Sequence, residues 1–155
     1  MSYDLRMDEP KLPFLEMTQK MISGELPPPP VADLVGMRLV EVGPDRAVFE
    51  MNASNRHANP MGTVHGGILC DLADGAMGVA WASGLVEGET FTTLELKINF
   101  LKPVWESTLR AEATVMRRGR LVGLVTCDVR DEGGALVAHV TSTCITLRGE
   151  QAKGR

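Results

Sequence analysis

The spacing of hydrophobic and polar residues changes several times along the chain, and each change predicts a different element. Between residues 14 and 23 apolar side chains recur at helical spacing, which predicts a short helix that ends at Gly24. The four prolines Pro27 to Pro30 cannot continue a helix and predict an extended connector. We therefore expect residues 1–30 to form an N-terminal helix and proline-rich connector, and residues 31–150 to form one folded domain.

From Leu34 onward apolar residues alternate with polar ones, which is the spacing of half-buried strands. Two such runs on either side of Pro44-Asp45 predict a β-hairpin. The polar stretch that follows, residues 52–63, contains Asn59-Pro60 and predicts a loop.

Residues 64–84 are the most apolar long stretch of the chain, and their hydrophobic side chains lie nearly all the way round a helix. This predicts a central helix that is buried on most sides. At 100° per residue, one stripe of this helix carries both of its acidic residues together with glycines: Gly67, Asp71, Asp74 and Gly78. A carboxylate among apolar residues loses hydration, which suggests a chemical task for Asp74, although a hydrogen-bonded core acid is the alternative.

Four long runs of strand character, separated by short turns, complete the pattern: residues 91–101, 107–117, 121–131 and 136–147. Because long antiparallel strands curl, we expect an α+β fold in which a curved antiparallel sheet wraps around the central helix. One sheet cannot cover that helix completely, so a second copy is expected at the open edge. The pattern thus predicts a homodimer, with a dimer of dimers left open.

Charge and composition exclude several classes of partner. The 155 residues carry a formal net charge of -4 and contain no long basic run, which argues against a nucleic-acid surface. Residues 1–9 lack the apolar segment of a signal peptide or membrane anchor. We expect a cytoplasmic protein with no membrane partner.

The cysteines and histidines do not have the spacing of a metal site. Three cysteines are far apart and form no C-x-x-C pattern, so reduced thiols are expected: Cys70, Cys127 and Cys144. Three histidines likewise lack the spacing of a zinc site: His57, His65 and His139. No metal is expected.

The start of the central helix is the main candidate for binding chemistry. The first N–H groups of a helix are unsatisfied and lie at the positive end of its dipole, and Gly66 and Gly67 leave them accessible. A carbonyl or developing oxyanion suits this position better than a nucleotide phosphate, because Ile68-Leu69 follows where a phosphate loop has Lys-Ser or Lys-Thr. Several other polar residues have ordinary structural alternatives, as caps, turn residues or strand formers: Asn59, His65, Asp71, Thr93, Arg118 and Arg120.

Two segments and one acid together resemble a known family. The run from Asn59 to Gly67 (NPMGTVHGG), the acid at Asp74, and the run from Thr92 to Pro103 (TTLELKINFLKP) resemble the hotdog-fold acyl-CoA thioesterases of the phenylacetyl-CoA, or PaaI-like, type. The resemblance extends from about residue 34 to residue 147. It implies that residues 31–150 form a hotdog thioesterase domain that hydrolyses an aryl- or fatty acyl-CoA to the free acid and CoA.

The same resemblance implies roles for individual residues. Asp74 would be the catalytic carboxylate, acting as general base on water or as direct nucleophile. The Gly66 N–H would polarise the thioester carbonyl, and Asn59 would help to hold that carbonyl or the water. Thr93 would orient the water or the carboxylate, and His65 would shape the start of the helix.

Further implications concern coenzyme A and the assembly. Gly67 would line the substrate site, and the Arg118-Gly119-Arg120 turn would bind the phosphates of coenzyme A. The site would lie across the dimer interface, where Asn59 and Gly66 from one subunit would meet Asp74 and Thr93 from the other. No cofactor would be needed.

Two other functions are compatible with the same pattern. One is dehydration or hydration of an acyl thioester, which requires a histidine placed to take the Cα proton. The other is a noncatalytic acyl-CoA binding module. The sequence does not identify the acyl group, and it leaves the role of Asp71 open.

Overall fold

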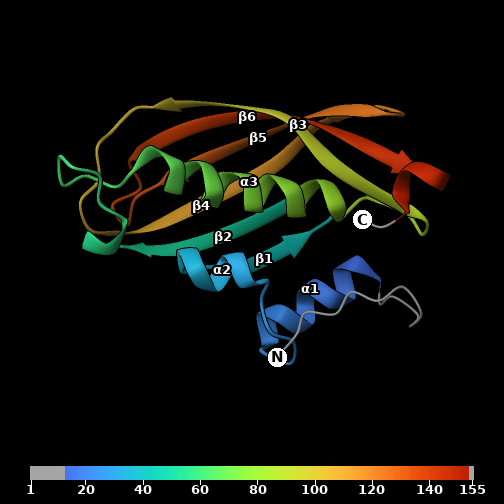
Figure 1. The fold of residues 1–155 in the computed structure, drawn as a ribbon, viewed down its shortest axis with the longest axis horizontal. Coiled ribbons are helices and arrows are strands. Elements are labelled where there is room, and N and C mark those ends of the chain that lie inside the picture. The colour runs from blue at the N-terminus through green and yellow to red at the C-terminus, as the bar shows by residue number, and fades with distance from the viewer. Residues whose placement is uncertain (1–12, 154–155) are drawn as a thin grey trace.

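The computed structural model describes residues 13–153, which form a curved sheet around one long helix (Figure 1). The helices are α1 (Phe14–Ser23), α2 (Pro30–Val35) and α3 (Gly66–Ala82), with short 3-10 turns at η1 (Asn55–His57) and η2 (Gly149–Ala152). The strands are β1 (Met37–Gly43), β2 (Arg46–Ala53), β3 (Glu89–Phe100), β4 (Ser107–Arg118), β5 (Val122–Arg130) and β6 (Leu136–Arg148). The expectation for residues 1–9 lies outside the described residues.

The six strands form one antiparallel sheet in the order β1-β2-β4-β5-β6-β3. Alternate residues of these strands face α3, and on β6 they are buried at every second position from Ala138 to Cys144. Helix α3 contacts all six strands, so the core lies between the helix and the concave side of the sheet. The predicted α+β architecture is confirmed.

The two edges of the sheet differ in what packs against them. At the β1 edge, α1 and α2 pack against the strand (Figure 1). Helix α1 has the predicted bounds, and the N–H of Gly24, in left-handed conformation, caps it through the Met21 carbonyl. At the other edge, no described strand pairs with the outer side of β3.

Four local expectations need correction. Pro30 is not part of an extended connector but begins α2, because proline is well suited to the first position of a helix. Strand β2 continues to Ala53 and η1 follows, where a loop was expected. Helix α3 begins at Gly66 rather than Val64, since the Val64 N–H donates to the Val104 carbonyl outside the helix. Strand β5 is two residues shorter than its predicted run, because Leu121 belongs to the turn and Asp131 to the next one.

The close packing of α3 against β5 depends on Gly123, which has no side chain. A Cβ placed on Gly123 of β5 would lie 2.3 Å from Cζ3 of the fully buried Trp81 and 2.4 Å from the Arg117 carbonyl oxygen. We expect Gly123→Ala to lower the free energy of unfolding by about 3 kcal/mol, the upper part of the range for overpacking. Urea denaturation measures this. Gly43→Ala, where a Cβ would meet no atom within 4 Å, is the matched control, and equal losses in both variants would contradict the explanation.

Candidate active site

The segment before α3 is held in place by two histidines. Buried His57 accepts a hydrogen bond from the Ser54 N–H at Nδ1 (3.1 Å), and its Nε2 lies 2.9 Å from the Val35 carbonyl oxygen. His65 caps α3, because its Nδ1 accepts a hydrogen bond from the Gly67 N–H at 2.9 Å. The Gly67 amide is therefore already occupied within the protomer.

The Gly66 amide, by contrast, has no hydrogen-bond partner among the described residues. It is the first residue of α3, where a helix offers free N–H groups at the positive end of its dipole. The Phe100 ring packs against it so closely that a Cβ on Gly66 would lie 2.8 Å from Cζ of Phe100. Glycine therefore allows both an aromatic wall and a free donor at the same place.

A groove of about 400 Å³ lies at this end of α3. Most of its lining is apolar, and it includes two predicted site residues: Asn59, Thr63, Val64, Gly66, Leu69, Phe100, Leu101, Lys102, Pro103 and Val104. Asn59 accepts a hydrogen bond from the Met61 N–H at Oδ1 and donates one from Nδ2 to Thr63 Oγ1, each at 2.9 Å. Since a side-chain amide carries two N–H donors, one of them is left for a ligand. We call Asn59 and Gly66 the amide half-site.

Asp74 lies on the open side of α3 and is exposed in the single protomer, as is Asp71. In one protomer Asp74 is not enclosed, because the sheet covers only the opposite side of the helix; its enclosure between two subunits stays a prediction. Thr93 Oγ1 of β3 donates a hydrogen bond to Asp74 Oδ1 at 3.2 Å. We call Asp74 and Thr93 the acid half-site.

The pKa of the Asp74 carboxyl lies above its usual range. Loss of hydration among the neighbouring side chains is the largest cause, even though the residue as a whole is exposed. The hydrogen bond from Thr93 opposes it by stabilising the charged form, and the negative charge of Asp71 adds to it. An acid with a raised pKa and one unpaired oxygen is a candidate for proton transfer.

The two half-sites are too far apart in one protomer to act on the same carbonyl group. Gly66 and Asp74 are eight positions apart on α3, which at 1.5 Å per residue is about 12 Å along the axis. Asp74 is exposed, and the groove beside Gly66 lies at the other end of this eight-residue interval.

Arg118 is used inside the protomer. Its guanidinium donates to Asp45 Oδ1 (3.1 Å from Nε) and to the Trp81 carbonyl (2.7 Å), and it lies 4.0 Å from the centre of the Trp81 ring. Arg118 therefore ties the end of α3 to Asp45 and is neither a simple turn residue nor free to bind coenzyme A phosphates in the protomer. The Gly119 N–H closes the turn on the Val122 carbonyl, and only Arg120 is left with an exposed side chain.

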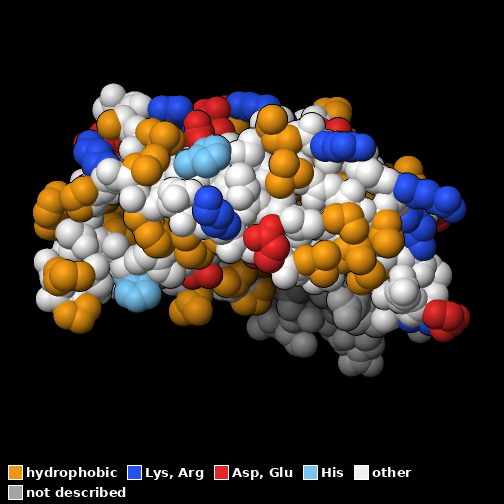
Figure 2. All heavy atoms as spheres, turned by 90° about the horizontal axis from the view of Figure 1, so that it is seen from above, with side chains coloured by type: hydrophobic (Ala, Val, Ile, Leu, Met, Phe, Trp, Pro, Cys, Tyr) orange, Lys and Arg blue, Asp and Glu red, His pale blue; other side chains and the backbone are white. Residues whose placement is uncertain are grey.

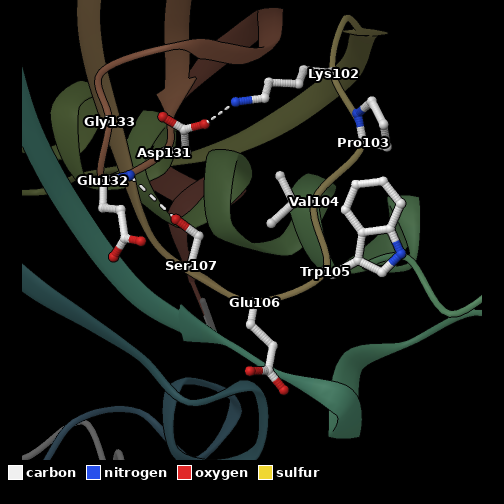
Figure 3. A pocket seen from close by; sticks show the side chains of 9 residues that line it. All are labelled: Lys102, Pro103, Val104, Trp105, Glu106, Ser107, Asp131, Glu132 and Gly133. Carbon is white, nitrogen blue, oxygen red and sulfur yellow. Dashed lines mark hydrogen bonds and ion pairs between the residues drawn. The ribbon is translucent and has the colours of Figure 1, made fainter.

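A second hollow, of about 410 Å³, lies on the other side of the Lys102–Val104 segment (Figure 3). There Lys102 is paired with Asp131, Ser107 accepts the Glu132 N–H, and the Trp105 ring is exposed. None of the predicted site residues lines it. The groove beside Gly66 is therefore the better candidate for the reaction.

Residues 13–153 contain no cluster of three metal-ligating side chains. Within the same range, no helix has the length and apolar character needed to span a bilayer.

Comparison with known proteins identifies the family. Residues 61–138 match the model of the thioesterase superfamily. A solved thioesterase from Haemophilus influenzae is 27% identical with a TM-score of 0.72, and the match covers 76% of this chain and 82% of that one. A mutant of the phenylacetic acid degradation protein PaaI from Thermus thermophilus is 26% identical with a TM-score of 0.69, covering 76% and 98%. Acyl-coenzyme A thioesterase 13 of Pongo abelii is 24% identical over 103 residues, which are 65% of this chain and 73% of that protein. The chain therefore belongs to the thioesterase superfamily, as a hotdog-fold thioester hydrolase similar to the PaaI proteins.

Proposed function

We propose that the chain is a homodimeric acyl-CoA thioesterase whose two equivalent sites each combine half-sites from both protomers. The observation that carries this proposal is the separation along α3 of the two half-sites, Asn59 with Gly66 and Asp74 with Thr93. Hydrolysis requires the Asp74 carboxylate and the Gly66 N–H to act on the same thioester carbonyl group. Within one protomer they are too far apart to do so.

In the proposed reaction Gly66 of the partner subunit donates its N–H to the thioester oxygen, and its positive helix end stabilises the charge that develops there. Asp74 takes a proton from water as the water oxygen bonds to the carbonyl carbon, or its own oxygen attacks that carbon. The C–S bond then breaks. On the first route the sulfur leaves as the thiol of coenzyme A with the proton that Asp74 took from water. On the second route the thiolate takes a proton from a water molecule, and the hydroxide so formed hydrolyses the mixed anhydride and frees Asp74. The other product is the free carboxylic acid, and no cofactor takes part.

The open edge of β3 supports the proposed dimer. This strand has twelve residues, and its outer side has no partner strand among the described residues. Leu94 and Phe100 on it are each 56% exposed. Figure 2, which looks at the protomer from the side of β3 and β6, shows groups of apolar side chains on this face. Pairing with a second β3 would provide hydrogen-bond partners for the N–H and C=O groups on this edge and would cover such side chains.

The groove limits the kind of acyl group. Its size is within the range of small-molecule sites, and Val64, Leu69 and Phe100 give it a mainly apolar wall. We propose that aryl or fatty acyl groups of coenzyme A thioesters bind there, and that Arg120 is free to meet a phosphate. The reaction is assigned to the cytoplasm, as expected from the sequence.

Release of free thiol tests the activity. Purified protein is incubated with phenylacetyl-, butyryl-, hexanoyl- and decanoyl-CoA, and thiol is followed with a chromogenic disulfide. Hydrolysis of at least one thioester at a rate far above the uncatalysed one supports the proposal. Tight binding without thiol release would instead show the noncatalytic binding module, and loss of water from a 3-hydroxyacyl-CoA would show the dehydratase.

The pH dependence of the rate reports on Asp74. The ionised form of Asp74 is the active one, so kcat/KM should decrease as the pH falls through the pKa of Asp74; we call this decrease the acid limb. Because that pKa is raised, the acid limb should lie above about pH 3.9, the ordinary aspartate value. Asp71→Asn removes a like charge one turn away, which lowers the pKa of Asp74 and moves this acid limb to lower pH. A limb that stays in place or moves to higher pH in Asp71→Asn contradicts the assignment.

A further inference from the structure

Beside the acid half-site, the alternation of inward and outward side chains along β3 is interrupted. Its register with β6 pairs Thr93 with Cys144 and Glu95 with Thr143, so Leu94 is an extra, unpaired residue. This β-bulge shifts the side-chain alternation by one position. Thr93 before the bulge and Leu96 after it therefore both face α3, and the bulge is what lets the strand continue into the core after aiming Thr93 at Asp74.

The backbone of the bulge is fixed by a buried hydroxyl. Ser142 of β6 is fully buried, and its Oγ donates a hydrogen bond of 2.8 Å to the Glu95 carbonyl, immediately after Leu94. The neighbouring inward positions of β6, Val140 and Cys144, are apolar. A hydroxyl in such a place costs free energy unless it is bonded, so the bond to the bulge accounts for the serine.

Thr93 is the link between this bond and the acid. It lies two residues before the carbonyl that Ser142 holds, and it is the only hydrogen-bond donor to the Asp74 side chain among the described residues. Its bond to Asp74 is 3.2 Å long, slightly longer than a typical O–H···O bond, so it depends closely on the position of the strand.

We propose that Ser142 is a positioning residue for catalysis, which holds the β3 bulge in the geometry that places the Thr93 hydroxyl on Asp74. The inference rests on the proposed function, in which Asp74 is the reacting carboxylate. Ser142 does not touch the substrate; it acts through Glu95 and Thr93.

The test is a double-mutant cycle with Ser142→Ala and Thr93→Val in the full-length protein. Each single variant is expected to lower kcat by about fivefold to tenfold with little change in KM, and the double variant to be no slower than Thr93→Val alone. The acid limb of kcat/KM should move to higher pH in both, because the carboxylate loses a stabilising donor. The other titratable groups around Asp74 are Cys70, Asp71 and Cys144. Only Cys144 loses partners in these variants, because hydrogen bonds with Ser142 and Thr93 lower the pKa of its thiol. Burial still holds that pKa above the ordinary thiol value, far from the acid limb.

Thr126→Val is the matched control, since it removes a hydroxyl that donates to the Val140 carbonyl across the same sheet but outside the acid half-site. It should leave kcat and the acid limb unchanged. If Ser142→Ala does not fold, Ser142→Cys, of similar size but a weaker donor, enters the same cycle.

Two outcomes separate the proposals. Additive effects of Ser142→Ala and Thr93→Val, or an unmoved acid limb, while Asp74→Asn still abolishes hydrolysis, would reduce Ser142 to a structural residue and leave the proposed function intact. Full hydrolysis by Asp74→Asn would overturn the proposed function, and the role of Ser142 with it.

Discussion

Asp74→Asn is expected to lower the rate of thioester hydrolysis by about a hundredfold or more, because the amide can neither take a proton from water nor attack the carbonyl carbon. The substitution changes the chemistry with little change in shape. The Asn oxygen can still accept the hydrogen bond from Thr93, and the residue is exposed in the protomer, so folding should be preserved. Thiol release under saturating substrate measures kcat, and sedimentation confirms that the dimer forms.

Asp71→Asn is the control for this substitution. It lies one turn before Asp74 on the same open stripe of α3 and removes the same charge, but it has no hydrogen bond to a strand residue in the described part of the chain. Its kcat at neutral pH should stay within about threefold of wild type, as for a change that acts only through a nearby charge. Equal losses in the two variants would show that the rate depends on the charge of the stripe rather than on one carboxylate.

The strands could be predicted from the sequence because their alternation is strong. Between Ala138 and Cys144 the inward positions of β6 alternate with polar outward residues, and glycine- and proline-containing turns mark its neighbours. Helix α2 was missed for the opposite reason. It has six residues and starts within a proline run, so no helical period is visible over so short a stretch.

The sequence could indicate which residues lie at the site, but not which residues they contact. The glycines and acids of the α3 stripe do lie on one side of the helix, because a period of 3.6 residues places them there. The exposure of Asp74 in the protomer could not be derived, since it depends on how far the sheet curves around α3. Nor could the engagement of Arg118 by Asp45, because those residues are 73 positions apart in the chain.

The partner of Ser142 at the Leu94 bulge could not be predicted from the sequence for a third reason. An inward-facing serine between Val140 and Cys144 was a readable signal, because a lone hydroxyl on an apolar face needs a partner. Its partner is a backbone carbonyl whose orientation follows from one extra residue in the opposite strand. Side-chain patterns do not reveal such a carbonyl.

Gly66→Pro is expected to lower kcat by about a hundredfold to a thousandfold, the loss seen when one oxyanion donor is removed. Proline deletes the N–H itself, yet it suits the first position of a helix, and His65 before it already has the extended conformation that proline requires (φ -63°, ψ 134°). Gly66→Ala is the matched control. It adds a Cβ against the same Phe100 ring but keeps the N–H, so the difference between the two variants isolates the donor.

Mixing the two inactive proteins then tests where each half-site comes from. In a mixed dimer of Gly66→Pro and Asp74→Asn protomers, one site receives the intact Gly66 of one chain and the intact Asp74 of the other, and the second site receives both substitutions. Random exchange should therefore restore about a quarter of the wild-type activity. If each protomer held a complete site of its own, every site in the mixture would carry one substitution and no activity would return, so an inactive mixture with proven exchange of protomers excludes the shared site.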